Sequence, residues 1–487
     1  MTDYQYYSGG KKVHVRLNTM DQVVRRGVAA RARQTRGAAV SAPVAGRAVA
    51  RLFRSEPEWL ATRFYELAPS EVQMSARRED RTFVVATETL VIDGARSSEI
   101  KFARDEFGLK LVREAKHDKV LLRAPGDEGE DRIALIFRAA NEIYKRGKSR
   151  AHPNFLRAMQ ENAVRKTVGS TAKLPWNLDN AGAPGAVGAD VHARAAWTIT
   201  EGRRDIRVAV LDEGVDTLHQ YLKSVVVREK DFVDGNSHAR PDGDDSHGTA
   251  CAGIVASQSD HTPGLARGCS LVAARIAKDD GTGLWIFDDF ATADAIDWCW
   301  DDAKADVLSN SWGGGPPVDV ITNAFERART LGRAGLGAVV AVAAGNEQGP
   351  VSYPGTLDGV ITVGASNEWD QRKTKTSSDG ENWWGSNFGP EIDLLAPGVH
   401  IRTTDIAGGR GYAGGQFTHD FNGTSAATPH VAAAAALVLS ANPGLPEARV
   451  REILKLNADP LSAGGWNVNE GNGRLNAYRA VWQARRG

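Results

Sequence analysis

Cysteine is scarce in this chain of 487 residues, which has only Cys251, Cys269 and Cys299. A small and odd number argues against a disulfide-stapled secreted scaffold and favours a reducing compartment. The N-terminal residues lack the apolar core of a secretory signal, and no unbroken apolar run reaches the roughly 18 residues that favour a membrane span. We therefore expect a cytoplasmic protein that does not bind a membrane.

The chain also lacks a net charge, with 60 Lys and Arg against 60 Asp and Glu. Residues 1–185 hold 33 basic and 22 acidic residues, so the remainder has an acidic excess of the same size. The stretch RRGVAARARQTRG (25–37) is similar to a nucleic-acid-binding arm, but acids mix in further along and no aromatic-interleaved motif follows. Two halves of opposite sign predict more simply that they dock on each other, without nucleic acid.

The chain is long enough to bury more than one core. Residues 4–17 predict a hairpin that turns at Gly9-Gly10, and residues 82–150 have the pattern of a small α+β domain of β-α-β-β-α order, with a last strand at 151–159. A polar stretch then predicts a linker. We divide the chain into an N-terminal extension of unknown role (1–81), the small domain (82–157), the linker (158–173) and a large C-terminal domain (174–487).

From about residue 186, apolar strands and helices alternate. This alternation predicts an α/β fold with a parallel sheet flanked by helices. Ligands of such sheets bind at the carboxyl ends of the strands. The polar residues that end the predicted strands are Asp212, Ser309 to Ser311 and Asn346, so we expect the functional site among them.

Three kinds of group make a serine hydroxyl attack a carbonyl: a histidine base, a carboxylate that orients it, and donors that hold the oxyanion. Ser425 precedes a long apolar helix, where free N–H groups and the helix dipole suit an anion, although a plain helix cap would look the same. Asp212 ends an apolar strand, and His247 opens a helix of small residues. With Asn346 and the Ser425 N–H as oxyanion donors, the order Asp, His, Asn, Ser predicts a catalytic constellation.

The blocks that carry these residues are VAVLDEGVD, SHGTACAGIVAS, SNSWGG, AAGN, LLAPG and NGTSAATPHVAAAAALVL. They resemble the signature blocks of the subtilisin-like serine proteases, in the family's order and over roughly residues 175–487. The resemblance implies a serine endopeptidase with Asp212, His247 and Ser425 as the triad and Asn346 in the oxyanion hole. It also implies two substrate-binding segments: an edge strand (Ser311, Trp312 and Gly313) and a wall of the S1 pocket (Ala343, Ala344 and Gly345).

Some features depart from that pattern. Cys251, four residues after His247, resembles the thiol-bearing branch that includes proteinase K and the kexins. The loop SQSDHTPGLARG lacks the Asn-rich insertion that holds calcium in many members, so a structural calcium is not supported. We expect no metal or cofactor in the chemistry.

By its element order and its position, the small domain at 82–157 resembles the propeptides that fold such proteases and plug their clefts. The resemblance implies a zymogen whose N-terminal domain is an intramolecular inhibitor and chaperone. Its tail would be HPNFLRAM (152–159) or the linker just beyond. What activates such a zymogen stays open.

Two other functions remain open: a permanently plugged scaffold or binding protein, and a protease dedicated to processing one peptide. The acids Asp242, Asp244 and Asp245 precede His247 and lie near the expected cleft. They predict a preference for Lys or Arg near the scissile bond, although they would equally serve to keep the domain soluble.

Overall fold

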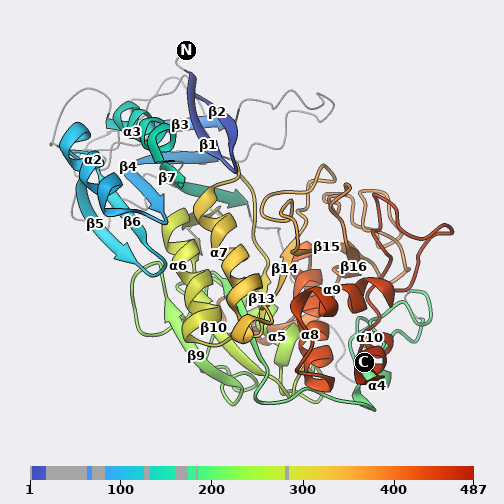
Figure 1. Cartoon of the computed structure of the whole chain (residues 1–487). Coiled ribbons are helices and arrows are strands. Elements are labelled where there is room, and N and C mark those ends of the chain that lie inside the picture. The colour runs from blue at the N-terminus through green and yellow to red at the C-terminus, as the bar shows by residue number, and fades with distance from the viewer. Residues whose placement is uncertain are drawn as a thin grey trace, which may run out of the picture. The chain divides into compact units, whose positions relative to one another are not determined.

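In a computed structural model of the chain, the C-terminal part is built on seven strands (Figure 1). Every neighbouring pair is parallel. In sheet order the strands are β16 (Leu394–Pro397), β15 (Ile361–Ser366), β14 (Val339–Ala343), β13 (Val307–Asn310), β8 (Arg207–Asp212), β10 (Ser270–Arg275) and β9 (Val226–Asp231). Every residue of β10, β13, β14, β15 and β16 is buried, as expected for a parallel sheet covered on both faces. The predicted α/β fold is confirmed.

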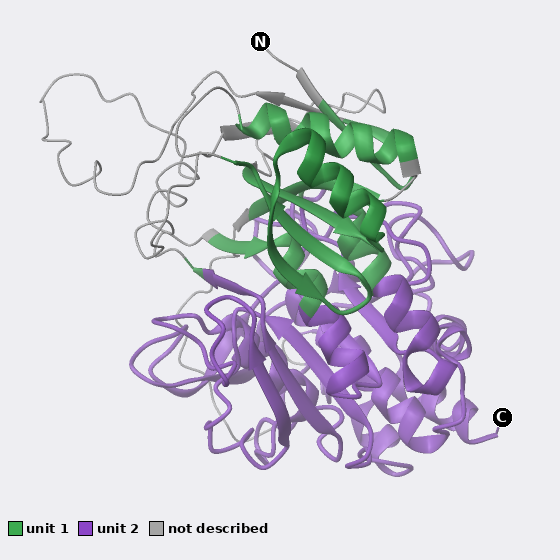
Figure 2. Cartoon of the chain, turned by 60° about the vertical axis from the view of Figure 1, so that its left-hand side comes forward, with its two compact units in different colours: residues 1–161, 279–294, 315–324 green, residues 162–278, 295–314, 325–487 purple. Residues whose placement is uncertain are grey.

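The structure describes residues 3–17, 63–67, 83–125, 132–147, 150–160, 174–182, 185–279 and 284–486. They form two compact units (Figure 2). The first unit comprises residues 1–161, 279–294 and 315–324, and the second comprises residues 162–278, 295–314 and 325–487. The predicted linker falls mostly on residues 161–173, outside the described part of the chain.

Helix α8 (Thr424–Ala441) is the core helix of the second unit and contacts β13, β14, β15 and β16. All of its residues except the last are buried, which explains why its sequence is apolar nearly all round. Among the helices of the described residues, α8 alone is long and apolar enough to cross a membrane, and 94% of its 18 residues are buried inside the protein. The remaining elements around this core are α4 (Ala193–Trp197), α5 (His247–Ala256), α9 (Glu447–Leu456), α10 (Ala477–Arg486) and the hairpin of β17 (Ile401–Gly408) and β18 (Gly415–Phe421).

The first unit contains an antiparallel sheet. Strands β1 (Asp3–Ser8) and β2 (Lys11–Leu17) form the predicted hairpin, followed across the sheet by β3 (Arg63–Leu67), β4 (Phe83–Asp93), β7 (Arg150–Gln160) and β12 (Leu284–Asp288). Strands β5 (Lys110–Ala115) and β6 (Lys119–Arg123) extend it beside β4. With α2 (Ser97–Phe107) and α3 (Arg132–Gly147), the predicted β-α-β-β-α order and its last strand are confirmed. Residues 152–159 therefore lie inside a strand, so any tail begins beyond β7.

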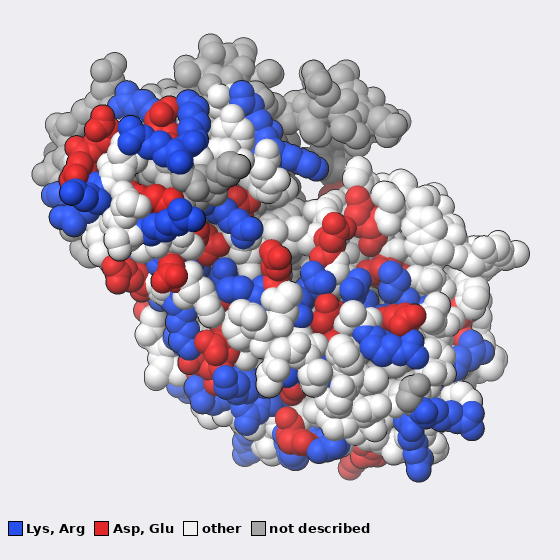
Figure 3. All heavy atoms as spheres, in the orientation of Figure 1, with Lys and Arg blue, Asp and Glu red and all other residues white. Residues whose placement is uncertain are grey.

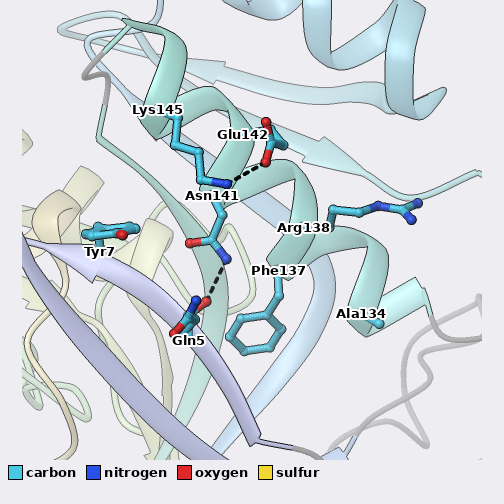
Figure 4. A pocket seen from close by; sticks show the side chains of 8 residues that line it. All are labelled: Gln5, Tyr7, Ala134, Phe137, Arg138, Asn141, Glu142 and Lys145. Atoms are coloured by element: carbon cyan, nitrogen blue, oxygen red, sulfur yellow. Dashed lines mark hydrogen bonds and ion pairs between the residues drawn. The ribbon is translucent and has the colours of Figure 1, made fainter.

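Along the chain, β12 is followed by α6 (Asp289–Asp297) and a π-helical turn (Trp298–Asp302), and β13 is followed by α7 (Asp319–Leu331). A pocket in the first unit lies between β1 and α3 (Figure 4), where Asn141 donates a 2.9 Å hydrogen bond to the Gln5 carbonyl. None of the expected catalytic residues lines this pocket. On the face drawn in Figure 3, the basic and acidic side chains of the described residues are interspersed, so the charge excesses counted along the sequence are not gathered into one patch there.

Candidate active site

Asp212 and His247 form a buried pair in the second unit. Asp212 is the last residue of β8, and His247 is the first residue of α5. The Nδ1 atom of His247 lies 2.9 Å from Oδ1 and 3.1 Å from Oδ2 of Asp212, and the two residues are 4% and 1% exposed. An ionised carboxylate only accepts hydrogen bonds, so Nδ1 carries the proton and Nε2 is left to act as a base.

Hydrogen bonds and close packing of neighbouring residues fix the positions of Asp212 and His247. The Glu213 carboxylate accepts a 2.6 Å hydrogen bond from the backbone N–H of His247, and the Glu213 N–H donates to Asp212 Oδ1 at 2.9 Å. A Cβ atom at Gly248 would lie 2.1 Å from the Gly214 carbonyl oxygen, so only glycine lets α5 approach the end of β8 this closely. The His-Gly pair is therefore a packing requirement of the site.

Two opposing effects act on the pKa of His247. Burial is the largest single effect and disfavours the imidazolium, but Asp212 and Cys251 together outweigh it and raise the pKa of His247 well above its ordinary value of 6.5. The imidazolium that forms when His247 accepts a proton is thereby stabilised, as a general base requires.

Cys251 lies between the histidine and the helix that carries the serine. Its Sγ atom is 3.7 Å from His247 Nδ1 and 3.6 Å from the backbone carbonyl of Ser425. Burial raises the pKa of this thiol, so it stays neutral and is a poor nucleophile. The thiol thus acts as a small packing group that touches both catalytic candidates.

Ser425 is the second residue of α8 and is 8% exposed. Its Oγ atom donates to the Ser311 carbonyl at 3.2 Å, and the Ser311 hydroxyl donates to the Ser425 carbonyl at 2.9 Å. The helix begins at Thr424, so the free N–H groups and the positive end of its dipole surround this hydroxyl. Cys251 is a contact shared by His247 and Ser425.

Asn346 is fixed against the residue before the serine. Its Oδ1 atom accepts hydrogen bonds from the Thr424 N–H at 2.8 Å and from the Thr424 hydroxyl at 3.0 Å. Among the residues that the structure describes, no group accepts from Asn346 Nδ2 or from the Ser425 N–H. Asn346 Nδ2 and the Ser425 N–H are therefore available as donors at the start of α8, and an oxyanion hole needs donors of this kind.

The two expected substrate-binding segments differ in their structure. Ala343 ends the buried strand β14, and Ala344 and Gly345 follow it directly beside Thr424, whose hydroxyl accepts from the Gly345 N–H at 3.2 Å. Ser311, Trp312 and Gly313 follow β13 directly and are not part of a strand, and β13 itself is a central strand of the sheet. Their pairing with a substrate backbone stays a prediction. The Trp312 ring is 2% exposed because it stacks on Phe325.

The acidic residues before His247 are less available than the sequence suggested. Asp242 lies 3.5 Å from the Arg275 guanidinium, and Asp245 is buried. Asp244 is exposed. Of the three predicted charges, one is therefore buried, one is exposed but paired, and that of Asp244 is exposed.

Sequence reasoning missed Glu213 and Thr424, which position the base and the oxyanion donor. Each adjoins a predicted catalytic residue in the sequence, and that adjacency is the signal that could have found them. Their roles depend on hydrogen bonds to residues 34 and 78 positions away, which no local pattern encodes.

Comparisons with known proteins show which family the chain is similar to. A family model described as the subtilase family matches residues 203–473. A calcium-dependent protease of Nostoc sp. is 28% identical over 82% of this chain, which spans 63% of that protein's length. Thermitase of Thermoactinomyces vulgaris is 33% identical over 60% of this chain and 93% of its own. The structure of fervidolysin from Fervidobacterium pennivorans, described as a keratinolytic enzyme related to subtilisin, superposes with a TM-score of 0.63 at 22% identity, over 84% of this chain and 62% of that one.

Proposed function

Because this chain belongs to the subtilase family, we propose that it is a serine endopeptidase that acts on proteins or peptides and is held in check by its N-terminal domain. The observation that carries the proposal is the buried pair of His247 and Asp212, 2.9 Å apart, at the end of β8. Cys251 contacts both His247 and the backbone carbonyl of Ser425 at the start of α8. Neither the pair nor the oxyanion donors need a metal for this chemistry.

In the proposed mechanism, Ser425 Oγ leaves its hydrogen bond to Ser311, gives its proton to His247 Nε2 and attacks the scissile carbonyl carbon. Asp212 keeps the Nδ1 proton and stabilises the imidazolium. The oxyanion accepts hydrogen bonds from Asn346 Nδ2 and the Ser425 N–H. Collapse of the tetrahedral intermediate breaks the C–N bond, and His247 returns the proton to the leaving amine. A water molecule then attacks the acyl-enzyme with His247 again acting as the base, and the acyl group is released from Ser425.

Inhibition by the N-terminal domain is supported by the fact that the first unit combines N-terminal segments with segments of the peptidase region. Strand β7 pairs with β12, which lies inside the region matched to the family, and Gln160 lies opposite Leu284. The Arg157 guanidinium is buried against the Asp289 carboxylate and donates to the Pro316 carbonyl at 2.8 Å. The N-terminal segment is thus tightly bound to segments of the peptidase region. We propose that the chain beyond β7 enters the cleft.

The test of the activity is labelling with a fluorophosphonate, which reacts with an activated serine. The isolated peptidase part should be labelled at Ser425, and the uncut chain should react slowly. A permanently plugged scaffold would stay unlabelled after the N-terminal domain is removed. A protease dedicated to one peptide would be labelled but would leave a peptide library almost uncut.

A preference for Lys or Arg remains part of the proposal with reduced support, because Asp245 is buried and Asp242 is paired with Arg275. Loss of that preference in Asp244→Asn would support it, and an unchanged cleavage profile would contradict it. A cytoplasmic location also remains a proposal that rests on the scarcity of cysteine.

A further inference from the structure

Three buried carboxylates surround the imidazole of His400 in the second unit, none of them used by the mechanism above. His400 Nδ1 lies 3.0 Å from Glu368 Oε1, and His400 Nε2 lies 3.7 Å from Glu381 Oε1 and 3.9 Å from Asp420 Oδ1. The carboxylates are 5%, 4% and 4% exposed, respectively. One ligand atom each of Glu381, His400 and Asp420 lies within 4.8 Å of the other two.

The charges of this cluster do not balance. Lys373 is buried nearby, but its Nζ atom is 2.9 Å from Asp379, which neutralises it. His400 carries at most one positive charge, so it can offset at most one of the three carboxylates. Among the described residues, the buried Oε2 atom of Glu368 has no hydrogen-bond partner. Neutral hydrogen-bond donors only partly offset the cost of burying three carboxylates around one imidazole, so the site favours an additional cation.

We propose that Glu381, His400 and Asp420 bind a divalent transition metal of the Zn²⁺ type. A nitrogen ligand disfavours Ca²⁺ and Mg²⁺, which prefer oxygen, whereas imidazole and carboxylate together suit Zn²⁺. With bonds of about 2.0–2.1 Å, the ligand atoms of a tetrahedral ion lie about 3.3 Å apart. The two carboxylate oxygens lie 3.7 and 3.9 Å from the imidazole nitrogen, and all three ligand atoms lie within 4.8 Å of one another, so the ligands would move closer together on binding the ion. The His400 side chain is 33% exposed, which leaves a path for the ion and a position for water.

The outer contacts suit a metal ligand set. Glu368 accepts the Nδ1 proton of His400, which directs the Nε2 lone pair toward the two ligand carboxylates. Trp384 Nε1 donates to the second oxygen of Glu381, and Asn422 Nδ2 donates at 3.2 Å to one oxygen of each ligand carboxylate. A histidine ligand whose other nitrogen donates to a carboxylate is the usual outer-shell arrangement of protein zinc sites.

The backbone around His400 connects this site to the nucleophile. His400 adopts a left-handed conformation (φ 51°), and its N–H donates to Asn422 Oδ1 at 2.8 Å. The Gly423 N–H donates to the Gly398 carbonyl at 2.9 Å, and Ser425 follows two residues later. A bound ion would therefore stabilise the turn that begins α8. This inference does not depend on the proposed peptidase activity.

The test uses the full chain with Ser425→Ala, so that self-digestion cannot occur. Titration with Zn²⁺ in a calorimeter should give one tight site per chain, and the ion should raise the Tm by several degrees. Asp212, His247 and Cys251 form a second group of close ligand atoms. Co²⁺ distinguishes the two groups, because binding at Cys251 gives a thiolate charge-transfer band and binding at His400 does not. A single site that shows this band would overturn the proposal.

Variants locate the site. His400→Asn, chosen because asparagine tolerates the left-handed backbone, and Glu381→Gln should each abolish tight binding. Glu368→Gln removes only an outer contact and should weaken binding about 10- to 100-fold. His261→Asn, at an exposed histidine, should leave the affinity unchanged. The Tm measured without metal identifies any variant that fails to fold. If His400→Asn fails to fold, the affinities of Glu381→Gln and Glu368→Gln for zinc decide whether the site exists. The absence of stoichiometric zinc, or equal affinity in the folded variants, refutes the site.

Discussion

Arg157→Met should release the N-terminal domain and raise the activity of the uncut chain. Arg157 and Asp289 are 1% and 0% exposed, and the guanidinium donates to both carboxylate oxygens and to the Pro316 carbonyl. Methionine keeps much of the volume but leaves the Asp289 carboxylate buried without its partner.

The structure sets the size of the effect. Breaking a buried pair by removing one partner costs about 3–5 kcal/mol. At about 1.4 kcal/mol per factor of ten, the docked state should be weakened roughly 10²- to 10³-fold. The open fraction, and with it the initial rate of hydrolysis of a small peptide, should rise by up to that factor. The rate is measured while gel electrophoresis shows that the chain is still uncut.

Two controls separate release from general damage. Arg194→Met breaks an exposed pair with Asp179, which is worth at most about 1 kcal/mol, and should leave the rate unchanged. Adding Asp289→Leu to Arg157→Met removes the stranded charge and should restore much of the inhibition. If Arg157→Met folds and the uncut chain is no more active than the wild type, this pair does not hold an inhibitory domain in place.

The remaining predictions concern the active site of the released peptidase. The charged imidazole cannot act as the base, so activity should fall as the pH drops through the raised pKa of His247. Asp212→Asn should move this fall in activity to lower pH and reduce kcat by on the order of 10⁴. A pH–rate profile whose fall at acid pH does not move in this variant would contradict the assignment. Asn346→Ala should reduce kcat by about 10²- to 10³-fold with little change in KM, and steady-state kinetics showing a change in KM alone would place Asn346 in substrate binding instead. Cys251→Ala should keep activity within a few-fold of wild type, since the thiol is neutral and buried; near-complete loss in a folded variant would make the thiol part of the chemistry.

Much of the second unit could be predicted because its signals are local. The strand of Asp212 and the helices of His247 and Ser425 each show a run of apolar or small residues beside one polar residue. A parallel sheet then brings the carboxyl ends of its strands to one edge, so the site follows from the pattern.

The rest depends on contacts that no local pattern encodes. Strand β12 reads as a short apolar segment, and nothing in it specifies pairing with β7, more than a hundred residues earlier. The ligands around His400 come from irregular loops and the end of β18, where neither helical nor strand periodicity helps. The expected pairing of residues 311–313 with a substrate rests on the resemblance alone, because these residues follow β13 and are not part of a strand.

The most direct test of the central claim is to map the serine that a fluorophosphonate labels after the N-terminal domain is removed. The peptidase part is treated with the reagent and digested, and the modified peptide is identified by mass spectrometry. The account predicts one label per chain, on Ser425, and neither labelling nor peptide hydrolysis in Ser425→Ala of unchanged circular dichroism. A label on another serine, or hydrolysis that survives in Ser425→Ala at a tenth of the wild-type rate, would contradict it.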